Sequence, residues 1–222
     1  MKCEQSLRTL GSPTALMVIA GLLYSSWPLG YWLNPSTNKG LASDLEALHQ
    51  PYRWLFISMD VGCGLLVAIA TTALLIKVRR GAVGKRAVEL WLAGIGALIF
   101  GLFTALDALL PLNCIQGEAN CVITIKNPSF VVHGIFSIGS IFGLTMSIFA
   151  ILILLLRKRR AVRKAIHLTP VLFLAIWIGF GVLTLHLILN NQSSALSQHI
   201  FIEFCALWLI ALPYFVNVGL TL

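Results

Sequence analysis

Charged side chains are scarce in this chain of 222 residues, where Asp, Glu, Lys and Arg make up only 11% of the sequence. A soluble domain usually carries about a quarter charged residues, so this chain has too few to cover a surface exposed to water. The 58% of apolar residues also excludes a disordered chain, which needs low hydrophobicity and high charge. With a mean hydropathy of +0.89, the composition predicts a protein that lies mostly in lipid.

The short alternating segments that are typical of membrane β-barrels are missing as well. The chain instead contains long apolar runs, and about 20 such residues cross a hydrocarbon core of about 30 Å as a helix. We expect a single all-α transmembrane domain, residues 1–222, with six spans at about 13–33, 54–76, 88–110, 130–156, 168–189 and 200–220. The first run can also be interpreted as a signal peptide, but no clear cleavage site follows it, so we expect it to be kept.

The basic residues are distributed unevenly between the two sides of these spans. Thirteen of the 16 Lys and Arg residues lie near the N-terminus or in the segments 77–86 and 157–164. Because short cytoplasmic loops collect positive charge, both termini are predicted to be cytoplasmic, with loops 34–53, 111–129 and 190–199 outside. The net charge of +8 then reflects topology and attraction to anionic lipids. We expect membrane lipids as partners and no nucleic acid, because no separate basic domain exists.

Two of the five cysteines, Cys114 and Cys121, lie seven positions apart in the predicted outer loop after the third span. An extracellular or periplasmic face is oxidising, so this spacing favours a disulfide. The alternatives are two free thiols, or a zinc knuckle, for which the loop offers no further His or Cys. Cys63 and Cys205 lie within spans and are interpreted as small buried residues.

Ionisable side chains within the spans are few, and apart from Glu89, which lies at the cytoplasmic end of the third span, they fall in the predicted outer half of the membrane. An ionised Asp in a membrane helix costs at least about 2.5–3.5 kcal/mol on insertion scales, so such groups face the bundle interior. Depth is counted from the outer end of each helix at 1.5 Å per residue. The groups in this outer layer are Asp60, Asp107, His133, His186, His199 and Glu203. Nearby small residues allow close approach of the helices, namely Gly62, Gly64, Gly101, Gly134 and Gly139. The sequence therefore predicts a polar cavity open to the outer face.

One hypothesis for this cavity is a metal-dependent hydrolase of a lipid or lipid-linked substrate. Three imidazoles can hold Zn²⁺ and leave a position for a water molecule, whose pKa the metal lowers to about 7. The predicted zinc ligands are His133, His186 and His199. The catalytic candidates are Asp60, Asp107 and Glu203 as ligand or base, and Ser58 or Ser137 as donor to an oxyanion. No contiguous metal motif such as H-E-x-x-H is present.

Other hypotheses assign no chemistry to these groups. Asp60 with Arg53, and His199 with Glu203, are spaced to form ion pairs that only hold the bundle together. A binder or transporter of a small polar ligand also places charged groups on its pathway, and a homodimer or another membrane protein as partner stays open. A haem with His133 and His186 as axial ligands is a further alternative. The aromatic residues near the outer interface indicate a membrane belt: Trp27, Tyr31, Trp32, Tyr52 and Trp54.

The run Q-P-Y-R-W-L-F-x-x-x-D that ends at Asp60, and the run L-D-A-L-L-P-L-x-C from Leu106 to Cys114, resemble a bacterial membrane family. That family is catalogued as domain of unknown function 998, and the resemblance implies a multi-pass protein of a bacterial inner membrane. The chain is also, more faintly, similar to the superfamily of alkaline ceramidases and adiponectin-type receptors, which are zinc-dependent membrane amidases. Their last helix carries an H-x-x-x-H pair where this chain has His199 and Glu203.

Overall fold

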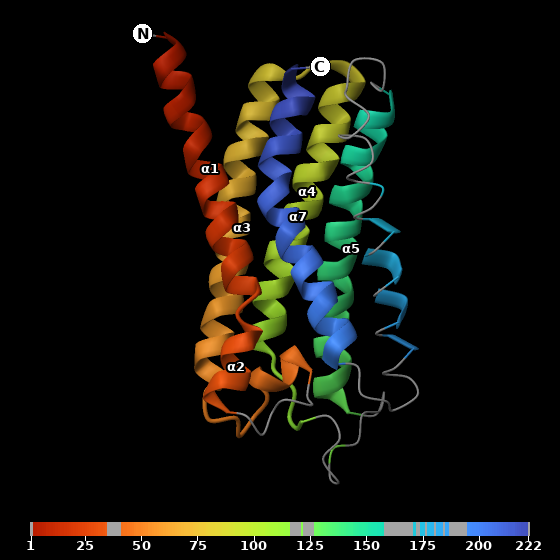
Figure 1. Ribbon diagram of the computed structural model, residues 1–222. Helices are drawn as coiled ribbons and strands as arrows, with labels where there is room; N and C mark the ends of the chain where they lie inside the picture. The colour runs from red at the N-terminus through yellow and green to blue at the C-terminus, as the bar shows by residue number, and fades with distance from the viewer. Residues whose placement is uncertain are drawn as a thin grey trace.

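The computed structural model describes residues 2–34, 41–115, 121, 127–157 and 195–221, and within the remaining segment residues 171, 174–175, 177–179, 181–183 and 185–186. Across the described residues every regular element is helical. The elements are α1 (Lys2–Tyr24), α2 (Trp27–Leu33), the 3-10 helix η2 (Ala42–Glu46), α3 (Arg53–Gly81), α4 (Gly84–Leu109), α5 (Pro128–Arg157) and α7 (Ala195–Thr221). The long helices lie side by side, and both termini lie at the same end of the bundle (Figure 1). The all-α prediction is confirmed.

Five described segments are long and apolar enough to cross a membrane: Pro13–Leu33, Arg53–Gly81, Gly84–Leu109, Pro128–Arg157 and Ala195–Thr221. They match five of the six predicted spans. The remaining prediction, at 168–189, falls largely outside the described residues, so six spans stay a prediction. Its described residues are helical, and Trp177 packs its ring against Phe201 of α7 with the centroids 5.2 Å apart.

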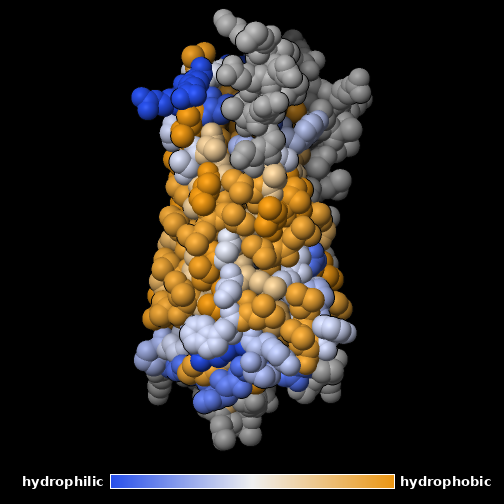
Figure 2. Space-filling model, turned by 90° about the vertical axis from the view of Figure 1, so that its left-hand side faces the viewer, coloured by the Kyte–Doolittle hydropathy of each residue, from blue (hydrophilic) through white to orange (hydrophobic). Residues whose placement is uncertain are grey.

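The outer surface of the bundle has the pattern of a membrane protein. Figure 2 shows a broad apolar belt between two polar ends. Large side chains such as Leu22, Leu65 and Ile69 are more than half exposed, which a water-soluble monomer tolerates only in small patches. Lipid chains bury such side chains without cost to the fold. The chain is therefore a multi-pass membrane protein, as the composition predicts.

The end of the bundle that carries both termini also carries the basic residues, and it is called the basic end below. It holds the charged side chains of Arg79, Arg80, Lys85, Arg86 and Arg157. The turn from α3 into α4 is short, and it requires a positive φ of 63° at Gly84, which glycine adopts without strain. Among the described residues, polar contacts such as the following two tie helices together in this half of the bundle. Arg157 pairs with the buried Glu89, and Lys77 donates to Asn217 at 2.5 Å.

Helix α7 contacts α1, α3, α4 and α5, and it supplies much of the core. Trp208, Leu209 and Leu212 are fully buried. The indole Nε1 of Trp208 donates to Ser147 Oγ of α5 at 3.1 Å, so this buried polar group is satisfied, as interior polar groups must be.

Glycines bring the central helices into backbone contact. A Cβ added to Gly101 of α4 would lie 2.8 Å from the carbonyl oxygen of Gly64 on α3, and one added to Gly143 of α5 would lie 2.6 Å from that of Gly96 on α4. Real Cβ atoms do not approach so closely, so only glycine permits these crossings. The predicted close approach at Gly64 and Gly101 is confirmed, whereas an added Cβ at Gly134 meets no atom within 4 Å.

Candidate functional site

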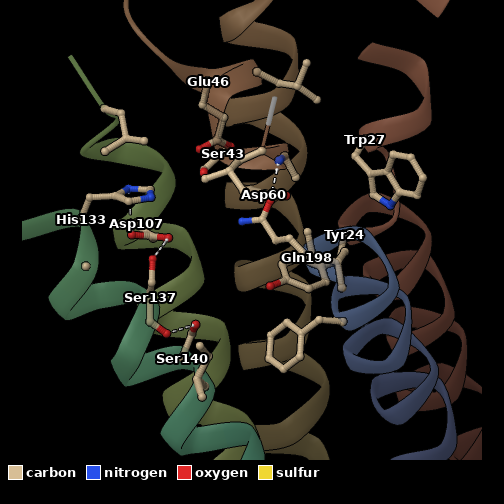
Figure 3. Close-up of a pocket in the computed structure, with 18 of the residues that line it drawn as sticks. Tyr24, Trp27, Ser43, Glu46, Asp60, Asp107, His133, Ser137, Ser140 and Gln198 are labelled. Atoms are coloured by element: carbon tan, nitrogen blue, oxygen red, sulfur yellow. Dashed lines mark hydrogen bonds and ion pairs between the residues drawn. The ribbon is translucent and has the colours of Figure 1, made fainter. Parts of the chain in front are cut away.

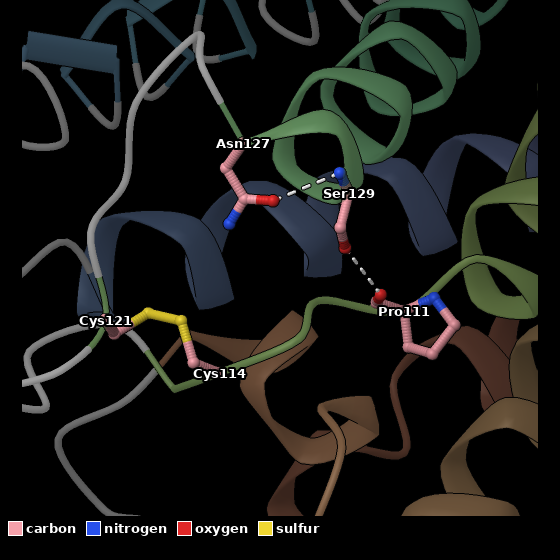
Figure 4. Close-up of a disulfide and its surroundings, with 5 residues drawn as sticks. All are labelled: Pro111, Cys114, Cys121, Asn127 and Ser129. Atoms are coloured by element: carbon pink, nitrogen blue, oxygen red, sulfur yellow. Dashed lines mark hydrogen bonds between the residues drawn. A yellow bond between two sulfur atoms is a disulfide. The ribbon is translucent and has the colours of Figure 1, made fainter.

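The beginning of α5 is fixed against the end of α4 by hydrogen bonds of the chain between them (Figure 4). Asn127 Oδ1 accepts from the backbone N–H of Ser129 at 3.1 Å, which caps the helix in the usual way. Ser129 Oγ donates to the carbonyl oxygen of Pro111 at 3.2 Å. Because of these bonds, the first turns of α5 stand beside the last turns of α4.

The predicted disulfide is present in the same connection. Cys114 and Cys121 are bonded, with their Cα atoms 5.5 Å apart (Figure 4), a separation that is usual for disulfides. The bond closes a short loop at the end of the bundle opposite the basic end. Cys63 and Cys205 are buried free thiols, as predicted.

The arrangement of α4 and α5 brings Asp107 and His133 together. His133 Nδ1 lies 3.0 Å from Asp107 Oδ1, an ion-pair distance without the alignment of a hydrogen bond. The other oxygen, Asp107 Oδ2, accepts a hydrogen bond from Ser137 Oγ at 2.9 Å. Ser140, one turn further along α5, donates to the carbonyl oxygen of Ser137 at 2.8 Å. Asp107 is thus partnered on both oxygens by side chains of α5.

Asp60 of α3 faces the same space because the Gly64–Gly101 contact presses α3 against α4. Asp60 lies one turn before Gly64, and Asp107 lies further along α4 than Gly101, toward the same end of the bundle. Figure 3 shows Asp60 and Asp107 pointing into one space from neighbouring helices. Two of the predicted carboxylates therefore meet in the structure.

A third carboxyl group comes from the short helix η2, outside the spans. Asp44 Oδ2 accepts from the backbone N–H of Leu41 at 2.7 Å, and the backbone N–H of Ala42 donates to Gln198 Oε1 of α7 at 2.6 Å. These contacts hold η2 across the end of the bundle. Glu46, at the last position of η2, is only 5% exposed and its carboxyl group lies against that of Asp60.

These groups line a cavity of about 480 Å³, called the acidic cavity below. Its polar lining includes Tyr24, Glu46, Asp60, Asp107, His133, Ser137, Ser140 and Gln198 (Figure 3). Its walls are largely apolar, with Phe56, Phe130 and Phe201 among them. The cavity draws its lining from α1, η2, α3, α4, α5 and α7, so it exists only when the whole bundle is assembled.

The ionisable side chains of Glu46, Asp60 and Asp107 make the described lining of this cavity acidic. Three carboxyl groups face it, and among the described lining residues there is no Lys or Arg. Burial raises the pKa of Glu46 well above its ordinary value, and the nearby Asp60 and Asp107 raise it further. Removing water disfavours a charged carboxylate, and neighbouring negative charges add to that cost. Glu46 therefore holds its proton more firmly than a glutamate in water.

His199 and Glu203 belong to a separate aromatic cluster. It lies between α7 and the break in the first span, where α1 ends at Tyr24 and α2 begins at Trp27. The His199 ring stacks on Trp27 with centroids 4.0 Å apart, and Tyr31 Oη lies 2.8 Å from His199 Nε2. Glu203 accepts hydrogen bonds from Trp27 Nε1 and Ser25 Oγ, both at 2.9 Å. These partners satisfy the two α7 groups, so they stabilise the break between α1 and α2. Trp27 alone of this cluster also lines the acidic cavity.

The predicted zinc ligands do not meet. Among the described residues, no group of three or more His, Cys, Asp or Glu side chains is arranged to hold a metal ion. The His133 ring lies against Asp107, and the His199 ring stacks on Trp27. The side chain of His186 is exposed. The three imidazoles were expected to converge because they lie at one depth, but depth alone does not set the direction that each helix face takes.

Ser58 and the predicted ion pairs are also placed differently from the expectation. Ser58 is exposed and donates to the carbonyl oxygen of Trp54 at 2.6 Å, away from the cavity. Arg53 lies over the ring of Trp54, 4.6 Å from its centroid, and forms no ion pair with Asp60 in the described structure. Trp27 was interpreted as part of a membrane belt, whereas it packs inside the bundle end; Trp32 and Trp54 are exposed as expected.

Sequence reasoning missed several polar residues of the cavity, among them Tyr24, Glu46 and Gln198. Glu46 lies in a predicted outer loop, where acidic residues are normally solvated. The loop does contain one signal of a buried segment, because its acidic residues are interspersed with Leu41, Leu45 and Leu48. Leu45 is buried in the structure. Gln198 and Tyr24 are single polar residues near helix ends, and nothing in the sequence distinguishes them from interface residues.

Comparisons with known proteins yield one family. Residues 17–213 match the model of a family described as "Protein of unknown function (DUF998)". No curated protein and no solved structure matches the chain. The fainter similarity to ceramidases and adiponectin-type receptors therefore gains no support from these comparisons.

Proposed function

Since the chain belongs to the DUF998 family of proteins of unknown function, its activity must be argued from its own site, and we propose that it binds a small molecule in the acidic cavity. A multi-pass membrane protein with such a site acts as a binder or as a transporter of the small molecule. The observation that carries it is the cavity itself, in which polar groups from six elements project between apolar walls. Ligand sites typically occupy about 300–1,000 Å³ and combine such walls with a few polar groups.

The cavity and the basic end lie at opposite ends of the bundle. The basic residues follow α3, begin α4 and end α5, whereas the cavity lies at the end that contains α2 and η2 (Figure 1). Positive charge collects on the cytoplasmic side of membrane proteins. We therefore place both termini inside and the cavity on the outer side, where a ligand can enter from outside the cell or from the outer leaflet.

The zinc-dependent hydrolase stays an untested prediction. The described His, Asp and Glu residues do not form a group suited to a metal ion, and Ser58 faces away from the cavity. A stoichiometric metal in the purified protein that is lost in His133→Ala would support it. No described contact favours the hydrolase over the binding function.

The first test concerns orientation and access. In a Cys3→Ser background, Ser43→Cys places a thiol in the cavity lining, and Arg80→Cys places one at the basic end. A thiol reagent that cannot cross membranes should label position 43 in intact cells, and position 80 only after permeabilisation. Labelling of position 80 in intact cells would show that the orientation is reversed.

The second test concerns binding. The purified protein in detergent micelles is heated with a panel of small aromatic compounds, matched in size, that are cationic, neutral or anionic. Gly134 lines the cavity and has free space around an added Cβ, so Gly134→Trp fills the cavity without displacing backbone. Gly179 has equal free space but does not line it, so Gly179→Trp is the matched control. Stabilisation lost only in Gly134→Trp supports binding. If no compound stabilises the protein, or if Gly134→Trp changes nothing, the proposed function is wrong.

A further inference from the structure

Resting on the proposed binding function, we infer that the ligand is a small organic cation, an ammonium group on an apolar body, and that Glu46 and Asp60 hold the ammonium. The inference concerns the class of ligand, so it can fail while the binding function stands. It follows from the charges that face the cavity, from one buried oxygen atom without a partner, and from the apolar walls.

The carboxyl groups of the cavity differ in how far they are already satisfied. Asp107 Oδ2 accepts a hydrogen bond from Ser137, and Asp107 Oδ1 lies 3.0 Å from His133 Nδ1, at ion-pair distance without a hydrogen bond. His133 lies against Asp107, and the described lining contains no Lys or Arg. No cationic side chain of the lining therefore neutralises the negative charge of Glu46 and Asp60. These two carboxyl groups face each other, and two adjacent carboxylates repel unless a proton or a cation lies between them. Among the described residues that line the cavity, the other titratable groups are Tyr24 of α1, Asp107 of α4 and His133 of α5, and the buried Cys63 of α3 also lies near Asp60.

One atom of this pair points to a ligand directly. Glu46 is 5% exposed, and its Oε1 is buried without any hydrogen-bond partner, although the residue lines the cavity. Leaving a buried acceptor without a hydrogen bond destabilises the folded protein. A donor on a bound molecule removes that cost, and a positively charged N–H group also neutralises the pair, which makes the hydrogen bond stronger.

The walls determine the rest of the ligand. Aromatic and aliphatic side chains surround the carboxyl pair, among them Trp27, Phe56 and Phe201. They suit an apolar body, and aromatic rings additionally attract a cation that lies over their faces. A bare metal ion fits poorly, because it needs several ligands and the described acidic and imidazole groups do not supply a suitable set. An organic ammonium requires only the carboxyl pair and the walls.

The test uses three probes of similar shape: 2-phenylethylammonium, the neutral 2-phenylethanol and the anionic phenylacetate. Binding to the purified protein at pH 7 is measured by calorimetry in micelles. The ammonium compound should bind, and the alcohol and the carboxylate should bind at least tenfold more weakly. Glu46→Gln or Asp60→Asn should weaken ammonium binding by about 10- to 100-fold, the size of a lost charge-assisted hydrogen bond. Gly134→Trp should abolish it.

The matched control is Glu89→Gln, which removes a carboxylate on α4 about 27 Å from Asp107 along the helix at 1.5 Å per residue. It should leave ammonium binding unchanged. If the alcohol binds as tightly as the ammonium, or if Glu46→Gln binds equally well, the inference is wrong. Binding of the alcohol as tight as that of the ammonium, and blocked by Gly134→Trp, would overturn the cation inference while supporting the binding function.

A second measurement remains decisive if the carboxyl variants do not fold. Gly134→Cys in the Cys3→Ser background places a thiol in the cavity. The ratio of the rate with a cationic methanethiosulfonate to the rate with an anionic one of similar size should be several-fold higher at this thiol than for free cysteine, because the carboxyl groups concentrate cations at that position. A ratio equal to or below that of free cysteine would overturn the inference.

Discussion

Replacing Glu46 by Gln is expected to stabilise the protein at neutral and higher pH. Glu46 is buried against Asp60, and its pKa in the folded protein is raised well above the ordinary value of 4.5. A carboxyl group with a raised pKa favours folding while it is protonated. Its contribution is complete below pH 4.5 and is lost as the pH rises through the raised pKa. Gln cannot ionise, so the variant does not undergo this loss.

The size of the effect follows from linkage. Each pH unit between 4.5 and the folded pKa is worth about 1.4 kcal/mol of unfolding free energy. For a protein of about this size, 1 kcal/mol changes the melting temperature by about 2–4 °C. Wild type and Glu46→Gln should therefore melt together near pH 4.5 and separate progressively at higher pH, with the variant the more stable.

The assay is the fraction of monodisperse protein after heating in detergent micelles, measured over a pH series. The control is Glu203→Gln, the same chemical change at another partly buried glutamate. Glu203 accepts from Trp27 through one oxygen and from Ser25 through the other, and the Gln amide nitrogen cannot accept either bond. The control should be destabilised by about 1–2 kcal/mol. The reasoning fails if Glu46→Gln is less stable than wild type above neutral pH, or if the two stay parallel across the series.

Three further changes test the structure around the cavity. Ser137→Ala removes the hydroxyl that donates to Asp107 at 2.9 Å, and we expect a loss of about 1–2 kcal/mol in the same melting assay; an unchanged midpoint would contradict the contact. Gly143→Leu should prevent a folded, monodisperse protein, because an added Cβ already lies 2.6 Å from the Gly96 carbonyl oxygen; normal yield and melting would rule out this helix crossing. Cys114→Ser should lower stability by about 2 kcal/mol through the opened loop and remove the dependence of melting on reducing agent, and a reducing-agent effect that persists would refute the disulfide.

The sequence by itself determined where five helices span the membrane, because hydropathy summed over about 20 residues does not depend on neighbouring helices. The helices α3, α4, α5 and α7 begin and end within about five residues of the predicted runs, whereas the first run, 13–33, is divided between α1, which begins at Lys2, and α2. The spacing of Cys114 and Cys121 in one loop determined the disulfide in the same local way. The layer of polar groups was also predictable, since position along a helix fixes depth at 1.5 Å per residue.

Only the tertiary structure decided which of those groups meet. Successive residues turn by about 100° around a helix, so the partner of each side chain depends on how neighbouring helices are rotated and how closely they approach. The Gly64–Gly101 contact places Asp60 beside Asp107, whereas the break between α1 and α2 directs Trp27 onto His199 and Glu203 and separates them from the cavity carboxylates. Glu46 enters the cavity because contacts distant in sequence, such as Ala42 with Gln198, fold η2 across the bundle end. Hydropathy contains no information about such contacts, because they depend on the direction of side chains rather than on their polarity.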